Sequence, residues 1–176
     1  MATNKMFFAG TGGMGVLLMG QIVGTAAISE EKAVTFFPSY GPEMRGGTAN
    51  CTVIVSDKEI SSPVIFESDC VVAMTLPSML KFEPTLRPGG TLLINTSLVH
   101  QAPKRSDITV IEVAATQSAI DMGEQRVANI IMLGAFVRTT DIVSEASVEQ
   151  VIRDVFGAKK AELLELELKA FDLWKQ

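Results

Sequence analysis

The sequence predicts an α/β fold: a single, mostly parallel twisted sheet with helices on both faces and a helical C-terminal segment. Several short runs are almost continuously apolar, which is typical of strands buried in a parallel sheet. Helical patterns separate these runs. Of the 176 residues, 47% are hydrophobic and 20% charged, which suits a globular protein and excludes a disordered one. We expect one domain over 1–176, with its core at about 5–140 and C-terminal helices at 147–174.

The first half of the chain supplies the clearest elements. Residues 5–9 form a short apolar run that predicts a buried strand, and the glycines at 10–15 predict a turn. Residues 16–29 are apolar nearly all round, which predicts a buried helix. Two runs that favour strands follow at 33–37 and 49–56, with a hairpin return at 59–60.

The second half continues the alternation of strands and helices. Pro77 favours the first turn of a helix, 88–90 reads as a turn, and Ser147 has the spacing of an N-cap with Gln150 three residues on. The predicted strands lie at 70–74, 91–94 and 107–113, and the predicted helices at 77–82, 114–121, 125–139, 147–156 and 159–174.

The stretch 38–50 holds two prolines, three glycines and the only tyrosine of the chain. Proline fixes φ and lacks a donor, so the stretch is predicted to be a shaped loop and not an interior strand. The groups suited to an anionic partner are Arg45 and the hydroxyls of Ser39, Tyr40 and Thr48. The alternative is a structural crossover in which Glu43 and Arg45 pair in solvent.

The glycine turn carries Gly10, Gly12, Gly13 and Gly15 between a strand and a helix. Such a turn lets the backbone approach a phosphate at the helix N-terminus, although tight packing of strand and helix needs the same glycines. A dinucleotide site also needs an acid at the end of the second strand, but Glu30 and Glu31 precede that strand. No Walker lysine follows the glycines either. The glycine turn therefore lacks the second residue that either kind of nucleotide site requires.

Four loops follow predicted strands: 10–15, 38–48, 75–77 and 95–97. Ligands of doubly wound sheets bind outside the carboxyl ends of the strands. If the strands are parallel, these loops share one rim, and we predict that this rim is the binding site.

Asn129 lies in an apolar helical stretch and needs hydrogen-bond partners if it is buried. It either ties a neighbouring loop in place or contacts a ligand.

Composition excludes several classes of site. The net charge of −5 argues against a nucleic-acid partner. Cys51 and Cys70 are predicted to be buried, reduced thiols of a cytoplasmic protein, and two cysteines are too few for an iron–sulfur cluster, which needs about four ligands. His100 is the only histidine, so it cannot form a site of several histidines, and it is predicted to be a plain loop residue.

An apolar segment near the N-terminus has two interpretations. Residues 6–28 carry no charge and include Gly20-x-x-x-Gly24, a spacing found in membrane helices. The four glycines at 10–15 break a helix, however, so a strand, a turn and a buried helix explain these residues better.

The last predicted helix is apolar over an arc of roughly 220°, against about 100° for an ordinary surface helix. Its excess apolar surface faces either another subunit or a groove of its own domain.

Several motifs of the chain resemble those of a known family. The motifs are GTGGMG at 10–15, PSYGPEMRGGTANC at 38–51, VIVSD at 53–57, ISSP at 60–63, LRPGGTLLIN at 86–95, RVAN at 126–129 and MLG at 132–134. From about residue 5 to 140 the chain closely resembles the gamma subunit of 2-oxoacid:ferredoxin oxidoreductases. One departure is Met14, which stands where the family usually has glutamine.

The resemblance implies a subunit of a complex that oxidatively decarboxylates a 2-oxoacid with coenzyme A. The expected partners are alpha and beta subunits, a ferredoxin-like delta subunit and ferredoxin, with thiamine diphosphate and iron–sulfur clusters held outside this chain. The form of the long loop resembles the 2-oxoglutarate and branched-chain oxoacid members more than the pyruvate members, and 2-oxoglutarate is the expected substrate. A stand-alone Rossmann-like oxidoreductase and a purely structural subunit are the alternatives.

No catalytic residue is expected within this chain. The residues expected to contact coenzyme A or a partner subunit are Gly10, Gly12, Gly13, Gly15, Ser39, Tyr40, Gly41, Glu43, Arg45, Gly46, Gly47 and Thr48.

Overall fold

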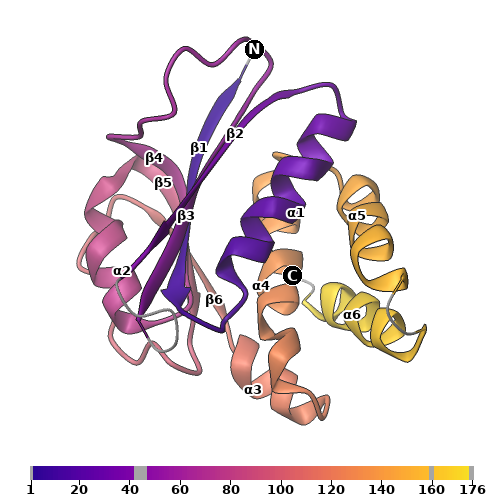
Figure 1. The fold of residues 1–176 in the computed structure, drawn as a ribbon. Coiled ribbons are helices and arrows are strands. Elements are labelled where there is room, and N and C mark those ends of the chain that lie inside the picture. The colour runs from indigo at the N-terminus through magenta and orange to yellow at the C-terminus, as the bar shows by residue number, and fades with distance from the viewer. Residues whose placement is uncertain (1, 42–46, 159–160, 175–176) are drawn as a thin grey trace.

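The computed structural model describes residues 2–41, 47–158 and 161–174. Within these residues, six strands form one mixed sheet in the order β2-β3-β1-β4-β5-β6 (Figure 1). The strands are β1 (Thr3–Thr11), β2 (Ala33–Tyr40), β3 (Thr48–Ser56), β4 (Ser68–Ala73), β5 (Leu86–Asn95) and β6 (Thr109–Val113). The helices are α1 (Val16–Ser29), α2 (Leu76–Phe82), α3 (Ala115–Asp121), α4 (Ala128–Thr140), α5 (Glu145–Gly157) and α6 (Ala161–Leu173).

The strand directions place four loops at one edge of the sheet. β1 pairs parallel with β4, β4 with β5 and β5 with β6. β3 is antiparallel to both of its neighbours, β1 and β2. β3 therefore runs against the other five strands, and β1, β2, β4 and β5 all end at the same edge, which we call the rim. The prediction of a mostly parallel α/β sheet is confirmed.

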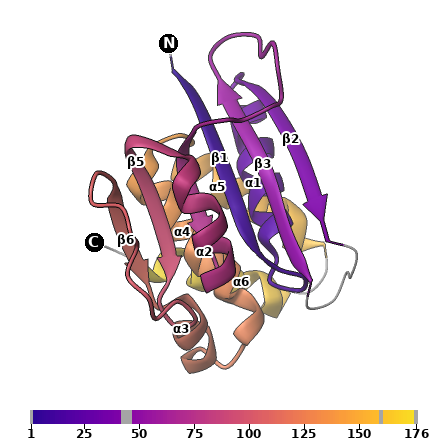
Figure 2. The ribbon, with the colours of Figure 1, turned by 90° about the vertical axis from the view of Figure 1, so that its left-hand side faces the viewer.

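Helices cover the two faces of the sheet unequally. α1 and α4 pack on one face, with α5 and α6 outside them, and α2 packs on the other face (Figures 1 and 2). The larger core includes Phe8, Met19 and Phe136, all fully buried. The smaller core lies under α2, where the Phe7 and Phe82 rings stand 4.6 Å apart between centroids. The rim is therefore one edge of a sheet that helices cover on both faces.

The predicted strand at 5–9 is longer in the structure, because β1 runs from Thr3 to Thr11 and includes Gly10 of the predicted turn, whereas α1 has the predicted bounds. Gly20 lies against Cys51 of β3, and a Cβ at Gly20 would overlap the Cys51 sulfur. Gly24 lies against Val34 of β2. The glycine pair therefore brings α1 close to the sheet. In the described part of the chain, no helix has the length and apolar character needed to cross a membrane.

The prediction of a loop over 38–50 is wrong at both ends, because strands occupy the first and last residues of this stretch. β2 continues through Pro38 to Tyr40, and β3 begins at Thr48. Pro38 is tolerated because β2 is the edge strand, where the missing N–H faces no partner strand. The Gly41 N–H donates to the Thr48 carbonyl at 2.8 Å and closes the hairpin. Residues 42–46 lie outside the described residues.

The start of β5 also differs from the prediction. Residues 88–90 are not a turn but part of β5, which begins at Leu86 instead of residue 91. Gly89 has φ +75°, and the register with β4 shifts between Ser68 and Cys70. Glycine permits this irregularity inside the strand, which the sequence pattern could not separate from a turn. Residues 59–60 form no hairpin strand, since 57–67 is an irregular connection.

Three predictions for the C-terminal half differ slightly from the structure. α5 is capped by Ser144 instead of Ser147, because the Ser144 Oγ accepts from the Ser147 N–H at 3.2 Å. The predicted helix at 125–139 begins as a 3-10 turn, Gln125–Val127, and continues as α4. β6 begins at Thr109, two residues after the predicted start at 107.

α6 packs against α4 and α5 of its own chain. Ala170 and Phe171 are buried, and the Arg138 Nη1 of α4 donates to the Phe171 carbonyl at 2.6 Å. Gly134 of α4 permits this approach, because a Cβ there would overlap the Phe171 carbonyl. The leucines of α6 are partly buried against the same core: Leu163, Leu164, Leu166 and Leu168. The wide apolar face of the helix thus largely fills a groove of its own chain.

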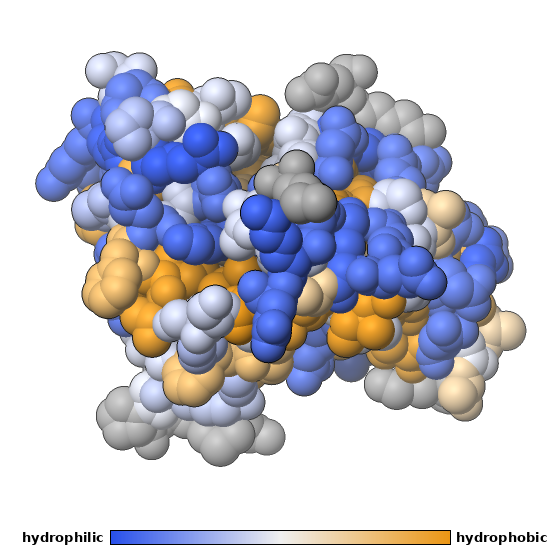
Figure 3. All heavy atoms as spheres, turned by 90° about the horizontal axis from the view of Figure 1, so that it is seen from above, coloured by the Kyte–Doolittle hydropathy of each residue, from blue (hydrophilic) through white to orange (hydrophobic). Residues whose placement is uncertain are grey.

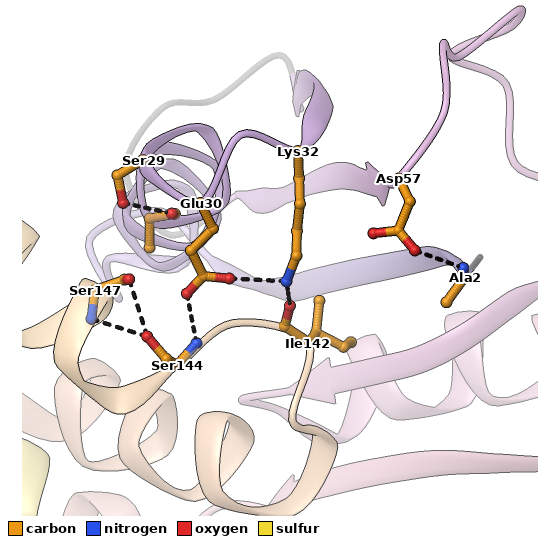
Figure 4. Close-up of polar contacts among 9 residues, drawn as sticks. Ala2, Ser29, Glu30, Lys32, Asp57, Ile142, Ser144 and Ser147 are labelled. Carbon is orange, nitrogen blue, oxygen red and sulfur yellow. Dashed lines mark hydrogen bonds and ion pairs between the residues drawn. The ribbon is translucent and has the colours of Figure 1, made fainter.

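A polar junction links the turn after α1 to the connection between α4 and α5 (Figure 4). Glu30 accepts hydrogen bonds from the Ser144 N–H at 2.7 Å and from Lys32 Nζ at 2.8 Å. Lys32 Nζ also donates to the Ile142 carbonyl at 2.6 Å. Burial raises the pKa of Glu30, but the hydrogen bonds from Lys32 and Ser144 outweigh burial and lower it to about 2.

Because the folded pKa of Glu30 lies below its ordinary value of 4.5, its stabilising effect is present above pH 4.5 and is lost as the pH falls towards 2. We expect Glu30→Gln to lower the free energy of unfolding by roughly 1 kcal/mol at pH 7, with the difference shrinking to zero near pH 2. Urea unfolding across this pH range checks it, with Glu31→Gln at the adjacent exposed residue as control. A constant difference at every pH would contradict the role of the Glu30 carboxylate.

Part of the surface on the α2 side is apolar. α2 contacts β4 and β1, and Phe37 of the edge strand β2 is 61% exposed. Val64 and Phe66, in the connection between β3 and β4, are 55% and 85% exposed. Figure 3, seen from above, shows an area of apolar side chains on the left, the side on which Figure 1 places this connection.

Candidate functional site

The glycine turn after β1 lies next to the hairpin formed by β2 and β3. The Gly12 N–H donates to the Gly47 carbonyl at 2.8 Å, which joins the two loops. The ends of β1 and β4 are joined similarly, since the Met74 N–H donates to the Ala9 carbonyl at 2.9 Å. The predicted shared rim is therefore present, and it survives the reversal of β3 because β3 begins at the rim instead of ending there.

A side chain of α4 contacts the glycine turn and holds it in place. Gly15, with φ +70°, immediately precedes α1. Asn129 of α4 is 5% exposed, and its Nδ2 donates to the Gly15 carbonyl at 3.4 Å. This confirms the interpretation that Asn129 ties a neighbouring loop in place. The amide therefore holds the turn in position from α4.

The N-terminus of α1 points at the rim with its first N–H groups free of side-chain caps. In the described residues, no side chain caps this terminus, and its first turn contains no acidic residue. The unpaired N–H groups and the helix dipole give this end a partial positive charge. The electrostatics of the turn therefore favour an anionic group.

A pocket of about 360 Å³ lies between the glycine turn and the β2–β3 hairpin, and we call it the Tyr40 pocket. Its lining residues are Thr11, Gly12, Gly13, Gly15, Val16, Leu17, Tyr40, Thr48 and Ala49. The Tyr40 ring is 58% exposed. Five of the predicted site residues meet here: Gly12, Gly13, Gly15, Tyr40 and Thr48.

Two further pockets adjoin the same turn. The Met14 pocket, of about 180 Å³, is lined by Gly13, Met14, Met74, Leu98, Thr116, Gln125, Arg126 and Ala128. A third pocket of about 280 Å³ lies towards α5 and α6 and includes Gly13, Gly15, Glu124, Arg126, Asn129 and Glu167. Gly13 lines all three pockets. The glycine turn therefore adjoins all three pockets.

The other predicted residues have different positions. Gly10 is a packing residue, because a Cβ there would lie 2.9 Å from Val16 Cγ1. Ser39 is exposed next to Tyr40 in β2, so strand alternation directs it to the opposite face, away from the pocket. Gly41 and Gly47 make the hairpin contacts described above. Glu43, Arg45 and Gly46 lie outside the described residues.

The structure adds a charged pair that sequence reasoning did not place at the site. Arg126 is 84% exposed and contacts Glu124, with Nη2 2.7 Å from Oε2 and Nε 2.9 Å from Oε1. The hydrogen bonds from Arg126 lower the pKa of Glu124 to about 2. Arg126 lines both the Met14 pocket and the third pocket. Its position follows from the approach of α4 to the glycine turn, which no local pattern reveals.

The two cysteines and the histidine lie outside these pockets. Cys51 and Cys70 are buried and free, as predicted, and burial raises the pKa of the Cys51 thiol to about 12 and that of Cys70 still further above its ordinary value. His100 is an exposed loop residue. Across the described ranges, no group of three or more His, Cys, Asp or Glu residues is placed to hold a metal ion.

The sheet and its rim define an α/β domain with a ligand-type hollow at the carboxyl ends of its strands. A family model, pyruvate ferredoxin/flavodoxin oxidoreductase, matches residues 5–174. The chain belongs to this family, as a domain of the gamma-subunit type, and the resemblance derived from its motifs is confirmed.

Named relatives agree with this assignment. The chain is 34% identical to the 2-oxoglutarate synthase subunit KorC of Methanocaldococcus jannaschii, over 98% of this chain and 95% of KorC. It is 35% identical to the ketoisovalerate oxidoreductase subunit VorA of Methanothermobacter marburgensis, over 96% of this chain. The chain spans only 35% of the length of VorA.

Solved structures share the fold. The gamma subunit of a keto/oxoacid ferredoxin oxidoreductase from Geobacter sulfurreducens is 32% identical, with a TM-score of 0.81 over 97% of this chain and 95% of its own. A 2-oxoglutarate:ferredoxin oxidoreductase from Magnetococcus marinus has a TM-score of 0.90 over 98% of this chain and 30% of its own. At 23% identity, that second likeness shows the fold alone.

Proposed function

We propose that this chain is the gamma subunit of a 2-oxoacid:ferredoxin oxidoreductase and that its rim contributes to coenzyme A binding and subunit assembly. The complex would convert a 2-oxoacid, coenzyme A and two oxidised ferredoxins into an acyl-CoA, CO₂, two reduced ferredoxins and a proton. The chain supplies binding and positioning, and we assign no catalytic residue to it.

The observation that carries the proposal is the meeting of the glycine turn and the hairpin around the N-terminus of α1. Gly12, Gly13 and Gly15 expose backbone, and Tyr40 and Thr48 line the opposite wall. Coenzyme A carries phosphates, which backbone N–H groups at a helix N-terminus bind well. Arg126, which is ion-paired with Glu124, also lies beside the same turn. Together these groups suit the phosphate-bearing part of this substrate.

The redox chemistry is assigned to other subunits. Thiamine diphosphate supplies the electron sink that decarboxylation of a 2-oxoacid needs. The two buried thiols are poor candidates for cluster ligands, because their raised pKa values disfavour the thiolate that binds metal. We therefore place thiamine diphosphate and the iron–sulfur clusters on alpha, beta and delta partners, in a cytoplasmic complex that reduces ferredoxin.

We propose 2-oxoglutarate as the substrate, on the form of the hairpin sequence at 38–51 and the relationship to KorC. VorA, a ketoisovalerate oxidoreductase subunit, matches at a similar identity. Substrate screening of the purified complex with 2-oxoglutarate, pyruvate and 2-oxoisovalerate separates the three. The highest kcat/KM is expected for 2-oxoglutarate.

The exposed apolar residues support a role in assembly. Phe37, Val64 and Phe66 are exposed by more than half of their surface. Aromatic side chains are enriched in the cores of protein interfaces. We assign this part of the α2 side to contact with a partner subunit.

The test of the proposed function is reconstitution of the complex with and without this chain. Coenzyme A-dependent reduction of ferredoxin by a 2-oxoacid is expected to be absent without the chain and restored when the chain is added. The chain alone is the control and should show no turnover. An unchanged rate in the complex that lacks this chain would refute the proposal.

A further inference from the structure

A pocket of about 250 Å³, which we call the Lys5 pocket, lies at the end of the sheet away from the rim. Its floor is formed by the first residues of β1 and the last residues of β3, where Lys5 and Ile54 are cross-strand neighbours. Its wall is the connection 57–67, which leads from β3 to β4. None of its lining residues lines one of the three pockets at the glycine turn.

Among the half-buried cations of the described residues, Lys5 alone has no carboxylate partner. The other three each form an ion pair with a carboxylate, namely Lys32, Arg105 and Arg138. The backbone N–H of Lys5 donates to Asp69 Oδ2 at 2.7 Å, but the Asp69 carboxylate forms its ion pair with Arg87. A half-buried ammonium has lost part of its hydration, so a carboxylate brought to it forms a favourable charged hydrogen bond.

The hydroxyl groups around Lys5 also suit a carboxylate. Ser62 Oγ accepts from the Val64 N–H at 3.2 Å, which leaves the hydroxyl hydrogen of Ser62 free to donate. Ser61 adds a second hydroxyl to the same wall. An ionised carboxylate only accepts hydrogen bonds, so an ammonium and two hydroxyls match it.

Glu59 is the one carboxylate that lines the Lys5 pocket. Its side chain is exposed, and within the described part of the chain it forms no ion pair with Lys5. The ammonium therefore stays available to a group from outside the chain. A competing arrangement, in which Glu59 turns towards Lys5 in solution, gives a different result in the experiment below.

Apolar side chains stand beside the Lys5 pocket. Val64 lines the pocket and is 55% exposed. Phe66, two residues further along the connection, is 85% exposed, the highest value among the large hydrophobic side chains of the described residues. A small anion in the pocket would leave both side chains in water, whereas a protein surface would cover them. The features together suit a protein partner that presents a carboxylate next to apolar side chains.

We propose that the Lys5 pocket, with Val64 and Phe66, is the docking surface for another subunit of the oxidoreductase, which places an aspartate or glutamate side chain on Lys5. This inference rests on the proposed function and adds the position and chemistry of the contact. The chain spans 95% of KorC but only 35% of VorA, so related domains occur both nearly alone and joined to further domains. Because the surface lies away from the rim, docking leaves the rim open.

Carbodiimide coupling of the assembled complex tests this contact, because the reagent joins an amine to a carboxylate only where the two meet. An amide bond is expected between Lys5 and an aspartate or glutamate of another subunit, located by mass spectrometry of the digested complex. The isolated chain is the control and should show no bond at Lys5. Coupling of Lys5 to Glu59 in both samples, or no coupling of Lys5 in the complex, would overturn the proposal.

Matched variants give an independent measurement, the Kd of this chain for a complex prepared without it. Lys5→Glu is expected to raise this Kd at least tenfold. Lys5→Met, which keeps the half-buried stem and with it the fold, should raise the Kd in the same direction. Lys58→Glu, at an exposed lysine of the same connection outside the pocket, should stay within about twofold. Phe66→Ala is expected to raise the Kd about tenfold, against no change for Ile120→Ala at a half-exposed residue of α3.

Failure of this inference and failure of the proposed function give different results. If Lys5→Glu and Phe66→Ala bind like wild type while the wild-type chain restores coenzyme A-dependent turnover, the docking surface is wrong and the proposed function stands. If the wild-type chain does not bind the other subunits, both fail. If only one of the two variants weakens binding, the other half of the contact is refuted. At saturating concentrations of each variant, the KM for coenzyme A is expected to equal that of wild type.

Discussion

Gly15→Ala is expected to lower the free energy of unfolding by about 3 kcal/mol. The backbone of Gly15 has φ +70°, a region that costs an L-residue with a Cβ roughly 1–2 kcal/mol. A Cβ at this position would also overlap the Nδ2 of Asn129, which donates to the Gly15 carbonyl. Loss of that hydrogen bond from a buried amide adds roughly 1 kcal/mol.

Gly89→Ala is the matched control for this substitution. Gly89 has a similar φ of +75°, but a Cβ there would meet nothing within 4 Å. It therefore carries the backbone strain without the overlap. Urea unfolding of the two variants, side by side, measures the difference. If Gly15→Ala is no less stable than Gly89→Ala, Asn129 does not hold the glycine turn.

The sequence was most informative where a local pattern had clear ends. The helix at 16–29 has the predicted bounds because a glycine turn precedes its apolar run and Glu30 follows it. The rim was predictable because each of its loops follows an apolar strand, and strands that run in the same direction end at the same edge. The reversed strand β3 did not alter this result, since the hairpin loop that leads into it lies on the rim.

Local patterns were misleading where tertiary position decides the structure. Pro38 argues against an interior strand, but it is accommodated in β2 because this strand lies at the edge of the sheet. The sequence therefore predicts Ser39 and Tyr40 to be loop neighbours, although a strand directs them to opposite faces. Their different positions follow from the three residues by which β2 extends beyond the predicted strand at 33–37.

The other side of the site comes from distant parts of the chain. Met74 and Leu98 follow β4 and β5, and Arg126 precedes α4, yet all three line one pocket with Met14. Only the packing of α4 under the glycine turn and the order of strands bring them together. Arg126 belonged to a recognised motif, but its proximity to Gly13 had no signal in the sequence. The contributions expected of Glu43, Arg45 and Gly46 stay predictions.

Gly13→Ala gives the second large expected effect, and it acts on function in addition to the backbone strain that it shares with Gly89→Ala. The methyl group finds open space in the fold, since a Cβ at Gly13 meets nothing within 4 Å. Gly13 lines the pockets of the rim, where we propose that coenzyme A binds, so the methyl group should displace the substrate. We expect the KM for coenzyme A to rise about tenfold in the assembled complex, a change of about 1.4 kcal/mol. The KM for the 2-oxoacid should not change.

The most direct test of the account is therefore the KM for coenzyme A of the reconstituted complex, compared between Gly13→Ala and Gly89→Ala. Gly89 shares the positive φ and the open surroundings of Gly13, but it lies near the start of β5, at the end of the sheet away from the rim. The account predicts a raised KM for Gly13→Ala and a value near wild type for Gly89→Ala. Indistinguishable KM values for coenzyme A in the two variants would contradict a binding site at the rim.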